Sequence, residues 1–304
     1  MIAKNNKKLN YSSSESFFSH TYTINCNGQL IDLSSPIVMG ILNVTPDSFY
    51  DGGKYSNEKS ILSHTEKMLE EGATIIDIGA NSTRPGSEFI SESDELTRLM
   101  PVLEILRKNF SDTIFSIDTF RSNVVETITE NFGDFIINDI SAGTFDNKMF
   151  ETIAEKQLPY ILMHIQGQPK NMQKNPTYKD ISNEILKYFS EKVDKLKILG
   201  VNDIIVDPGF GFGKSLEHNY ELLDKLDNFK ILELPICVGF SRKSMIHKLL
   251  NISPNESLNG TTVLNTIAVQ NGASILRVHD VKEALETIKI FNMFKNTSLE
   301  ISNS

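Results

Sequence analysis

The sequence has no tryptophan, only two cysteines in 304 residues, and no long uninterrupted apolar run. Cys26 and Cys237 stand far apart at no metal-ligand spacing, so they indicate no zinc site, and Cys237 in LPICVGF is expected to be a buried thiol. No run approaches the length that spans a bilayer. The first residues carry lysines without a following apolar segment, so no secretory signal is predicted. We therefore expect a cytoplasmic protein.

Basic residues are too few to balance the acidic ones: 30 Lys and Arg stand against 39 Asp and Glu, for a net charge of −9. An acidic total argues against general nucleic-acid binding, but it leaves room for a local basic site that holds an anion. The composition, with 39% hydrophobic and 23% charged residues, is that of an ordinary globular protein with a sizeable core.

The most informative stretch is IIVDPGFGFGKSLEHNYELL, residues 204–223. Its β-branched start predicts a strand buried on both faces, and Asp207 ends that strand. A glycine-rich loop follows, where backbone can approach a ligand closely, and Ser215 is the expected N-cap of the next helix. A carboxylate at the carboxyl end of a buried strand, facing such a loop, is poorly explained by stability and points to a site.

The rest of the chain repeats this strand–loop–helix unit. The apolar runs that predict strands are 36–44, 73–80, 113–120, 134–143, 160–167, 204–206, 235–240 and 274–281. Eight alternating units predict parallel strands with right-handed crossovers, as in an α/β fold of the (β/α)₈ TIM barrel type. The alternative, an open doubly wound sheet, would favour a dinucleotide glycine fingerprint after the first strand, and TPDSFYDGG does not supply one.

One domain is expected over residues 21–295, with the barrel at 36–295. The segment 21–33 alternates around Asn27-Gly28 and predicts a β-hairpin ahead of the barrel, placed to close its bottom. Residues 1–20 are polar and predict a flexible segment, and residues 296–304 predict a polar tail. A helix is predicted at 94–110, although Pro101 is unfavourable inside it.

Polar residues follow the predicted strands at their carboxyl ends, where barrels of this kind carry their chemistry. They are Asn43, Thr83, Arg84, Asp118, Asn138, Asp207, Lys243, Arg277 and His279. Taken singly, each could cap a helix or pair within the structure. Two carboxylates, two carboxamides and several basic residues on one rim are hard to explain that way, so we predict a binding site.

The residue types suggest two halves of one ligand. Carboxylates with an Asn and a Lys suit a flat heterocycle that offers both N–H donors and ring acceptors. Arg277 and His279 with Asn43 suit an anion such as pyrophosphate, together with a hard divalent cation that takes oxygen ligands. No Ser-His-Asp arrangement or zinc spacing is present, and His164 is expected to be a structural or lining residue.

The ordered motifs resemble the dihydropteroate synthase family of pterin-binding enzymes. They run from Ile37 to Ala284 and read MGILNVTPDSFYDGG, GATIIDIGANSTRPGS, SIDTF, INDISAG, LMHIQG, VDPGFGFGK, GFSRKSM and ILRVHDV. The chain departs from the family at Asn81, where Glu is usual, at Ala80 and His247, where Gly is usual, and at Ala142 of SAG. None of these positions belongs to the pterin-holding set.

The resemblance implies a reaction and roles. A 6-hydroxymethyl-7,8-dihydropterin diphosphate would lose pyrophosphate as p-aminobenzoate attacks its methylene carbon, giving 7,8-dihydropteroate. The implied pterin-binding residues are Asp118, Asn138, Asp207 and Lys243. The implied diphosphate and Mg²⁺ residues are Asn43, Arg277 and His279, with Asn43 as the metal ligand. The implied p-aminobenzoate region contains Thr83, Arg84, Pro85 and Ser241. Either Phe212 or Phe210 is expected to line that pocket, and packing at the barrel rim is the alternative for both. A homodimer is implied as well.

Two other functions stay open on the sequence alone. A methyltransferase that uses methyltetrahydrofolate and a corrinoid protein would need no diphosphate site, and the segments Ser-Arg-Lys and Arg-Val-His argue against it. A non-catalytic pterin-binding subunit would bind without releasing pyrophosphate, so an assay separates it from an enzyme.

Overall fold

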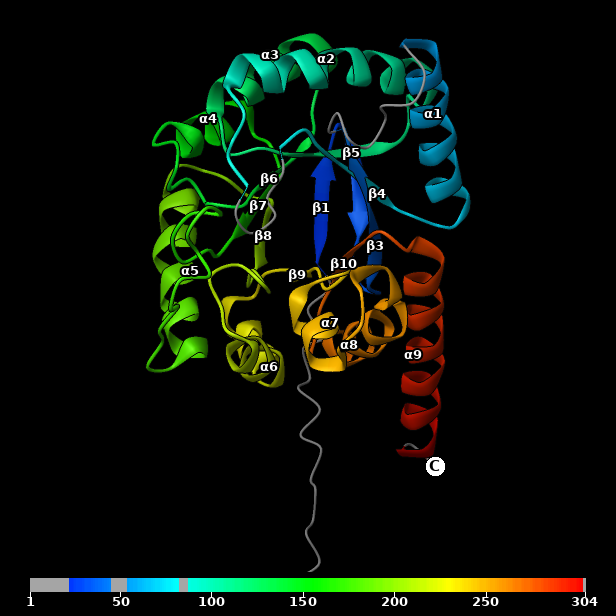
Figure 1. Cartoon of the computed structure of the whole chain (residues 1–304), viewed down its shortest axis with the longest axis vertical. Helices are drawn as coiled ribbons and strands as arrows, with labels where there is room; N and C mark the ends of the chain where they lie inside the picture. Colours follow the sequence, from blue (N-terminus) through cyan, green and yellow to red (C-terminus); the bar gives the residue numbers. More distant parts are fainter. Residues whose placement is uncertain (1–21, 45–53, 82–86, 303–304) are drawn as a thin grey trace, which may run out of the picture.

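A nearly closed barrel of eight parallel strands forms the centre of the computed structural model, which describes residues 22–44, 54–81 and 87–302 (Figure 1). The strands are β3 (Ile37–Asn43), β4 (Ile75–Gly79), β5 (Ile114–Asp118), β6 (Ile136–Asp139), β7 (Tyr160–Met163), β8 (Ile204–Asp207), β9 (Cys237–Val238) and β10 (Ile275–Val278). They pair in the order β8-β7-β6-β5-β4-β3-β10-β9, and a parallel bridge between Val206 and Ile236 joins the two ends. The predicted TIM barrel is confirmed.

Helices surround the strands as an outer ring (Figure 1). They are α1 (Lys54–Glu70), α2 (Glu92–Asn109), α3 (Ser122–Phe132), α4 (Met149–Lys156), α5 (Ile181–Ile198), α6 (Leu216–Asp224), α7 (Ser244–Leu250), α8 (Leu258–Gln270) and α9 (Val281–Ser302), with 3₁₀ turns at Leu226–Leu232 and Pro254–Glu256. Helix α2 accommodates Pro101 in its interior. Helix α9 continues to Ser302, into the residues expected to form a polar tail.

None of the helices within the described ranges combines the length and the apolar character that crossing a membrane requires. The predicted flexible segment at residues 1–20 lies outside the described residues, and so do the loops at 45–53 and 82–86.

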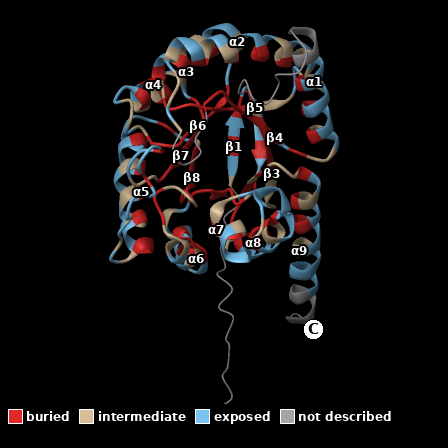
Figure 2. Ribbon diagram, viewed as in Figure 1, coloured by how far each residue is buried: buried red, intermediate tan, exposed pale blue. Residues whose placement is uncertain are grey.

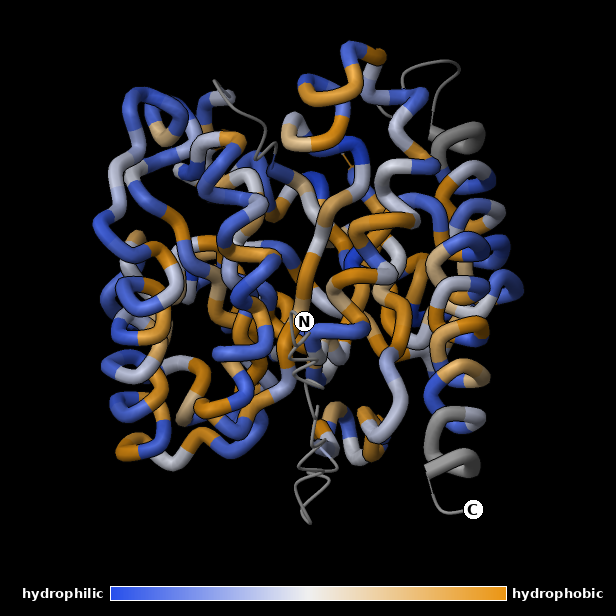
Figure 3. Tube along the Cα trace, turned by 90° about the horizontal axis from the view of Figure 1, so that it is seen from below, coloured by the Kyte–Doolittle hydropathy of each residue, from blue (hydrophilic) through white to orange (hydrophobic). Residues whose placement is uncertain are grey.

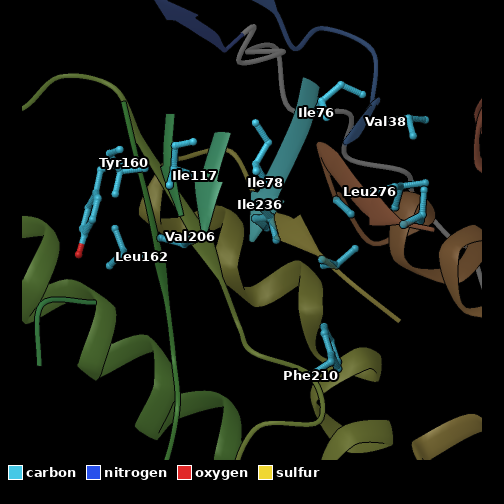
Figure 4. Close-up of a cluster of buried hydrophobic side chains, with 14 of the residues drawn as sticks. Val38, Ile76, Ile78, Ile117, Tyr160, Leu162, Val206, Phe210, Ile236 and Leu276 are labelled. Carbon is cyan, nitrogen blue, oxygen red and sulfur yellow. The ribbon is translucent and has the colours of Figure 1, made fainter. Parts of the chain in front are cut away.

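The main core lies between the strands and the helices. Alternate strand residues point outward into this layer, among them Val38, Ile76, Ile117, Val206 and Leu276 (Figure 4). Burial is concentrated on the strands and on the inner faces of the helices (Figure 2), and apolar segments gather inside the helical ring (Figure 3). Both faces of each strand are therefore covered, which explains why the strands read as continuous apolar runs.

The interior of the barrel holds a second apolar cluster at its amino-terminal end. It combines strand residues Met39, Ile75, Ile136, Ile161, Ile205, Cys237 and Ile275 with the hairpin residues Ile24, Cys26, Ile31 and Leu33. The hairpin consists of β1 (Thr23–Cys26) and β2 (Gln29–Asp32), and it lies across the middle of the barrel in Figure 1. The predicted hairpin is confirmed, and it closes the bottom of the barrel.

Side chains two residues apart on a strand point to the same face, so the layer above this cluster is formed by the residues two positions further along each strand. Two residues further along each strand, the same face carries Ile41, Asp77, Ser116, Asn138, Met163, Asp207, Gly239 and Arg277. Several of these are polar although they are buried, including Asp77, Asn138 and Asp207. The barrel interior thus changes from apolar to polar within two residues of each strand, and the candidate site begins at that level.

Replacing Ile24 by Ala should destabilise the protein, because it removes a buried side chain from the closure of the barrel. Ile24 is 2% exposed, and a Leu or Ile to Ala change at such a position costs about 2–5 kcal/mol. Urea unfolding followed by circular dichroism measures the loss. Leu30 belongs to the same hairpin but is 73% exposed, so Leu30→Ala should leave the midpoint nearly unchanged. Equal midpoints for the two variants would contradict the closure.

Candidate active site

A largely buried guanidinium, with 21% of the Arg277 side chain exposed, bridges two carboxylates at the centre of the polar layer. Arg277 on β10 donates from Nε to Asp77 Oδ2 over 2.7 Å, and its Nη2 lies 2.6 Å from the same oxygen. The same Nη2 donates to Asp118 Oδ2 on β5 over 2.9 Å. Asn138 on β6 donates weakly to Asp77 over 3.3 Å. Side chains from four strands therefore meet at one level of the barrel.

The electrostatics of this cluster are those of charges withdrawn from water. Burial raises the pKa of Asp118 to about 7; Arg277 opposes the rise, and Asp77, Glu95 and Asp139 add to it. For Arg277, burial lowers the pKa, but Asp77 and Asp118 outweigh that effect and the net shift is upward. The arginine is therefore a permanent cation, whereas Asp118 can gain or lose a proton near neutral pH.

Asp207 ends β8 beside a second cation, Lys243. The Gly209 N–H donates to Asp207 Oδ1 over 2.7 Å, and Lys243, which precedes α7, donates from Nζ to the Phe210 carbonyl over 2.5 Å. Burial lowers the pKa of Lys243 to about 8, and Asp207 opposes that shift. Burial also raises the pKa of Asp207, while Lys243 lowers it. The two groups thus support each other's charged forms.

In the glycine loop, residues 208–213, every backbone carbonyl from residue 209 to residue 213 accepts a hydrogen bond. Gly209 O accepts from Phe212 N and from Lys214, and Phe212 O accepts from Lys214. Phe210 O accepts from Lys243, Gly211 O from Gln173, and Gly213 O from Tyr178.

Gly209 must be glycine, since its φ is +71° and a Cβ there would lie 1.9 Å from His164 O. The loop therefore packs tightly against His164, which follows β7, and its hydrogen bonds hold it in one conformation beside Asp207.

The remaining predicted residues lie around these two clusters. Asn43 ends β3. A Cβ on Gly79 would lie 3.7 Å from Asn43 Oδ1 and 3.5 Å from Asp118 Oδ2, so both side chains lie beside Gly79. The Ser241 hydroxyl accepts from the His279 N–H over 3.3 Å, so these residues lie together past β9 and β10. The Phe212 ring centroid is 4.9 Å from Lys243 Nζ. Thr83, Arg84 and Pro85 lie outside the described residues.

The sequence reasoning missed Asp77, the principal partner of Arg277. Asp77 is fully buried in the middle of β4, so it did not stand out among the residues at strand ends. The available signal was a carboxylate interrupting the apolar run ATIIDIGA, because a charge is rarely buried without a partner. Lys214 was missed for a similar reason: it was read as part of a loop motif, yet it is 2% exposed.

Residues 39–279 match the family model described as pterin binding enzyme. The chain belongs to the pterin-binding enzyme family. Curated relatives of this pterin-binding enzyme are named dihydropteroate synthase. The protein of Escherichia coli (strain K12) is 46% identical over 265 residues, which are 86% of this chain and 93% of the relative. The protein of Haemophilus influenzae is 43% identical over 272 residues, 89% and 98% of the two chains.

Solved structures of this family agree with the fold. Yersinia pestis dihydropteroate synthase in a sulfonamide drug complex aligns with a TM-score of 0.84 at 44% identity, covering 90% of this chain and all of the other. Xanthomonas albilineans dihydropteroate synthase with 4-aminobenzoic acid aligns with a TM-score of 0.83 at 33% identity, covering 90% and 98%. The family resemblance read from the motifs is confirmed.

Replacing Arg277 by Met should destabilise this pterin-binding enzyme strongly, because Asp77 and Asp118 lose the cation between them. Removing one partner of a buried ion pair costs about 3–5 kcal/mol. Without Arg277 the pKa of Asp118 rises further, so the folded state binds more protons than the unfolded state, in which Asp titrates near about 3.9. The deficit should therefore be largest near about pH 8 and shrink towards about pH 5.5.

Urea midpoints across this pH range test the prediction, with Lys225→Met as the control. Lys225 pairs with Glu221 at 2.8 Å on the surface of α6, so its loss should change the midpoint little at any pH. An Arg277→Met deficit that is constant with pH would contradict the proposed coupling.

Proposed function

We propose that this chain has dihydropteroate synthase activity, joining 6-hydroxymethyl-7,8-dihydropterin diphosphate to p-aminobenzoate and releasing pyrophosphate. The observation that carries the proposal is the meeting of two carboxylates with Lys243 and Arg277 at the carboxyl end of one barrel. Its curated relatives are named for this activity, and the chain covers more than nine-tenths of their length.

Asp118, Asn138, Asp207 and Lys243 are proposed to hold the pterin. A carboxylate accepts two parallel N–H bonds from an amino-pyrimidine edge, and a carboxamide both donates and accepts. Lys243 adds a donor for a ring oxygen or nitrogen. Because the glycine loop and the barrel fix these groups in place, little reorganisation is needed when the ring binds.

Arg277 and His279 are proposed to hold the diphosphate. Within the described residues, the hydrogen bonds of Arg277 use Nε and Nη2, which leaves Nη1 for an anion. Negative charge grows on the departing pyrophosphate, so a fixed cation in a site withdrawn from water lowers the barrier. Arg277, Lys243, Asn43 and His279 are the residues proposed to act in catalysis.

Asn43 is the proposed ligand of Mg²⁺. No group of three or more His, Cys, Asp or Glu residues that could hold a metal occurs in the described part of the chain. Mg²⁺ nevertheless fits here, since it is commonly held by one or two protein oxygens plus substrate phosphates and waters. When bound, it would offset charge on the diphosphate oxygens.

The part of the site that binds p-aminobenzoate is proposed to involve Thr83, Arg84, Pro85, Ser241 and Phe212. An aromatic amine is neutral at pH 7 and attacks without prior loss of a proton, so no dedicated general base is required. The Phe212 ring beside Lys243 places an apolar surface next to the proposed pterin position, where an aryl ring can pack. The Xanthomonas albilineans relative was solved with 4-aminobenzoic acid.

A homodimer is proposed through the face formed by α7 and α8. Apolar side chains are exposed there, namely Leu249, Leu250, Leu258, Val263 and Ile267. Exposed apolar clusters of this kind mark association surfaces. A cytoplasmic location is also proposed, because Cys26 and Cys237 are both free thiols, as is usual in a reducing compartment.

Purified protein given the pterin diphosphate, p-aminobenzoate and Mg²⁺ should release pyrophosphate in equal amount to dihydropteroate. Omitting either substrate should abolish release, and EDTA should suppress it until Mg²⁺ is restored. Asp207→Asn should lower kcat/KM by about 10²-fold, because a buried carboxylate acceptor for the ring is lost. Pterin binding without pyrophosphate release by folded wild-type protein would favour a non-catalytic binding subunit instead.

Val263→Glu should convert the proposed dimer to a monomer, since it places a charge on the apolar α7–α8 face. Val263 is 50% exposed, so the substitution should leave the fold intact. Light scattering coupled to size exclusion measures the mass. Ile231→Glu, at an exposed apolar residue after α6, is the matched control and should keep the dimer. A wild-type monomer, or a dimer that survives Val263→Glu, would overturn this interface.

A further inference from the structure

Lys214 is a buried lysine to which the proposed mechanism gives no role. It is 2% exposed and follows the glycine loop directly. Its Nζ lies 3.0 Å from His164 Nδ1, 2.9 Å from Gly209 O and 3.0 Å from Phe212 O. A buried charge usually has a carboxylate in contact, but among the described residues these three neutral acceptors are its closest partners.

The three close acceptors match the three N–H donors of an ammonium group, and the His164 carbonyl lies farther away at 3.5 Å. A neutral amine would have one donor too few, and its lone pair would face an acceptor. Burial and the neighbouring Lys243 lower the pKa of Lys214 well below its usual range, and the nearby Asp207 carboxylate works against that shift. The contact geometry opposes the lowered pKa, because every close acceptor around Nζ needs a donor, and on that geometry we assign the charged form.

The contact with Lys214 also fixes the state of His164. With Lys214 assigned as an ammonium group, which only donates, His164 Nδ1 is assigned as the acceptor and the ring proton is placed on Nε2. Burial and the neighbouring Lys214 and Lys192 hold the pKa of His164 well below its usual range, so the ring stays neutral. Its ring packs against Tyr188, with centroids 4.9 Å apart, which sets its orientation.

Lys214 and Lys243 both donate to backbone carbonyls of the glycine loop. Lys214 holds the carbonyls of Gly209 and Phe212, and Lys243 holds the carbonyl of Phe210 between them. Gly209 N–H in turn donates to Asp207, and the Phe212 ring lies beside Lys243. A shift of the loop would therefore move the Asp207 partner, the Lys243 partner and the Phe212 ring together.

We propose that Lys214, oriented by neutral His164, is a positioning residue for the pterin-binding wall formed by Asp207, Lys243 and Phe212. The inference rests on the proposed function, because the wall has this role only if the pterin diphosphate binds there. In this proposal Lys214 does not contact the pterin ring itself. It holds the loop carbonyls so that Lys243 and Asp207 keep the spacing that the ring requires, and its charge helps to keep Asp207 ionised.

The first test is Lys214→Met, which keeps an apolar side chain of similar length but removes the charge and the donors. The KM for the pterin diphosphate should rise about tenfold to a hundredfold, with a smaller change in kcat, because the wall binds substrate and transition state alike. Lys225→Met is the matched control. Lys225 loses the same charge and length in this change, but it pairs with Glu221 at 2.8 Å on the protein surface, so the KM of Lys225→Met should stay close to that of wild type.

The second test compares His164→Asn with His164→Leu and serves even if Lys214→Met does not fold. Both variants lose the ring packing against Tyr188, but only Asn keeps an acceptor near the position of Nδ1. His164→Asn should retain a KM near that of wild type, and His164→Leu should resemble Lys214→Met. A merely structural role for the ring would raise KM equally in both.

The outcomes separate the two hypotheses. If wild-type protein releases no pyrophosphate, the proposed function fails. If wild type is active but Lys214→Met keeps its KM, or if the two His164 variants share one KM, the positioning role of Lys214 is wrong.

Discussion

The pairing of Arg277 with Asp77 and Asp118 is the interaction on which the site depends. It joins β10 to β4 and β5 inside the barrel, where Asp77 is fully buried and Asp118 and Arg277 are largely withdrawn from water. The arrangement contributes little to stability in net terms, because desolvation opposes the attraction. What it provides is fixed charge at a fixed place, and fixed charge is what catalysis of a charge-separating reaction uses.

The barrel makes this arrangement possible by dividing its interior into levels. The lower level is apolar and sealed by the hairpin, so it supplies cohesion, while the level above can carry groups that would be costly in an ordinary core. The change takes two residues along each strand, as from Ile75 to Asp77 or from Ile205 to Asp207. Residues that stabilise the barrel and residues of the candidate site therefore lie only two positions apart on the same strands.

Much of this could be predicted from sequence because each strand–loop–helix unit carries its own local signals. The barrel, the hairpin and the polar residues at the strand ends followed from apolar runs and turn residues. Asp77 could not, since its partner Arg277 is 200 residues away and only the closed barrel brings them together. The contacts of Lys214 with loop carbonyls also leave no pattern, because backbone acceptors are the same at every residue.

The hairpin has a consequence for the traffic of small molecules. Among the described residues, β1 and β2 fill the amino-terminal end of the barrel, so the proposed substrates would enter and leave at the end where the strands finish. Both substrates and both products would then use the same opening of the barrel. If the pterin ring binds against Asp207 and Asp118, as proposed, it would have to bind before p-aminobenzoate, and the product would have to leave through the same opening.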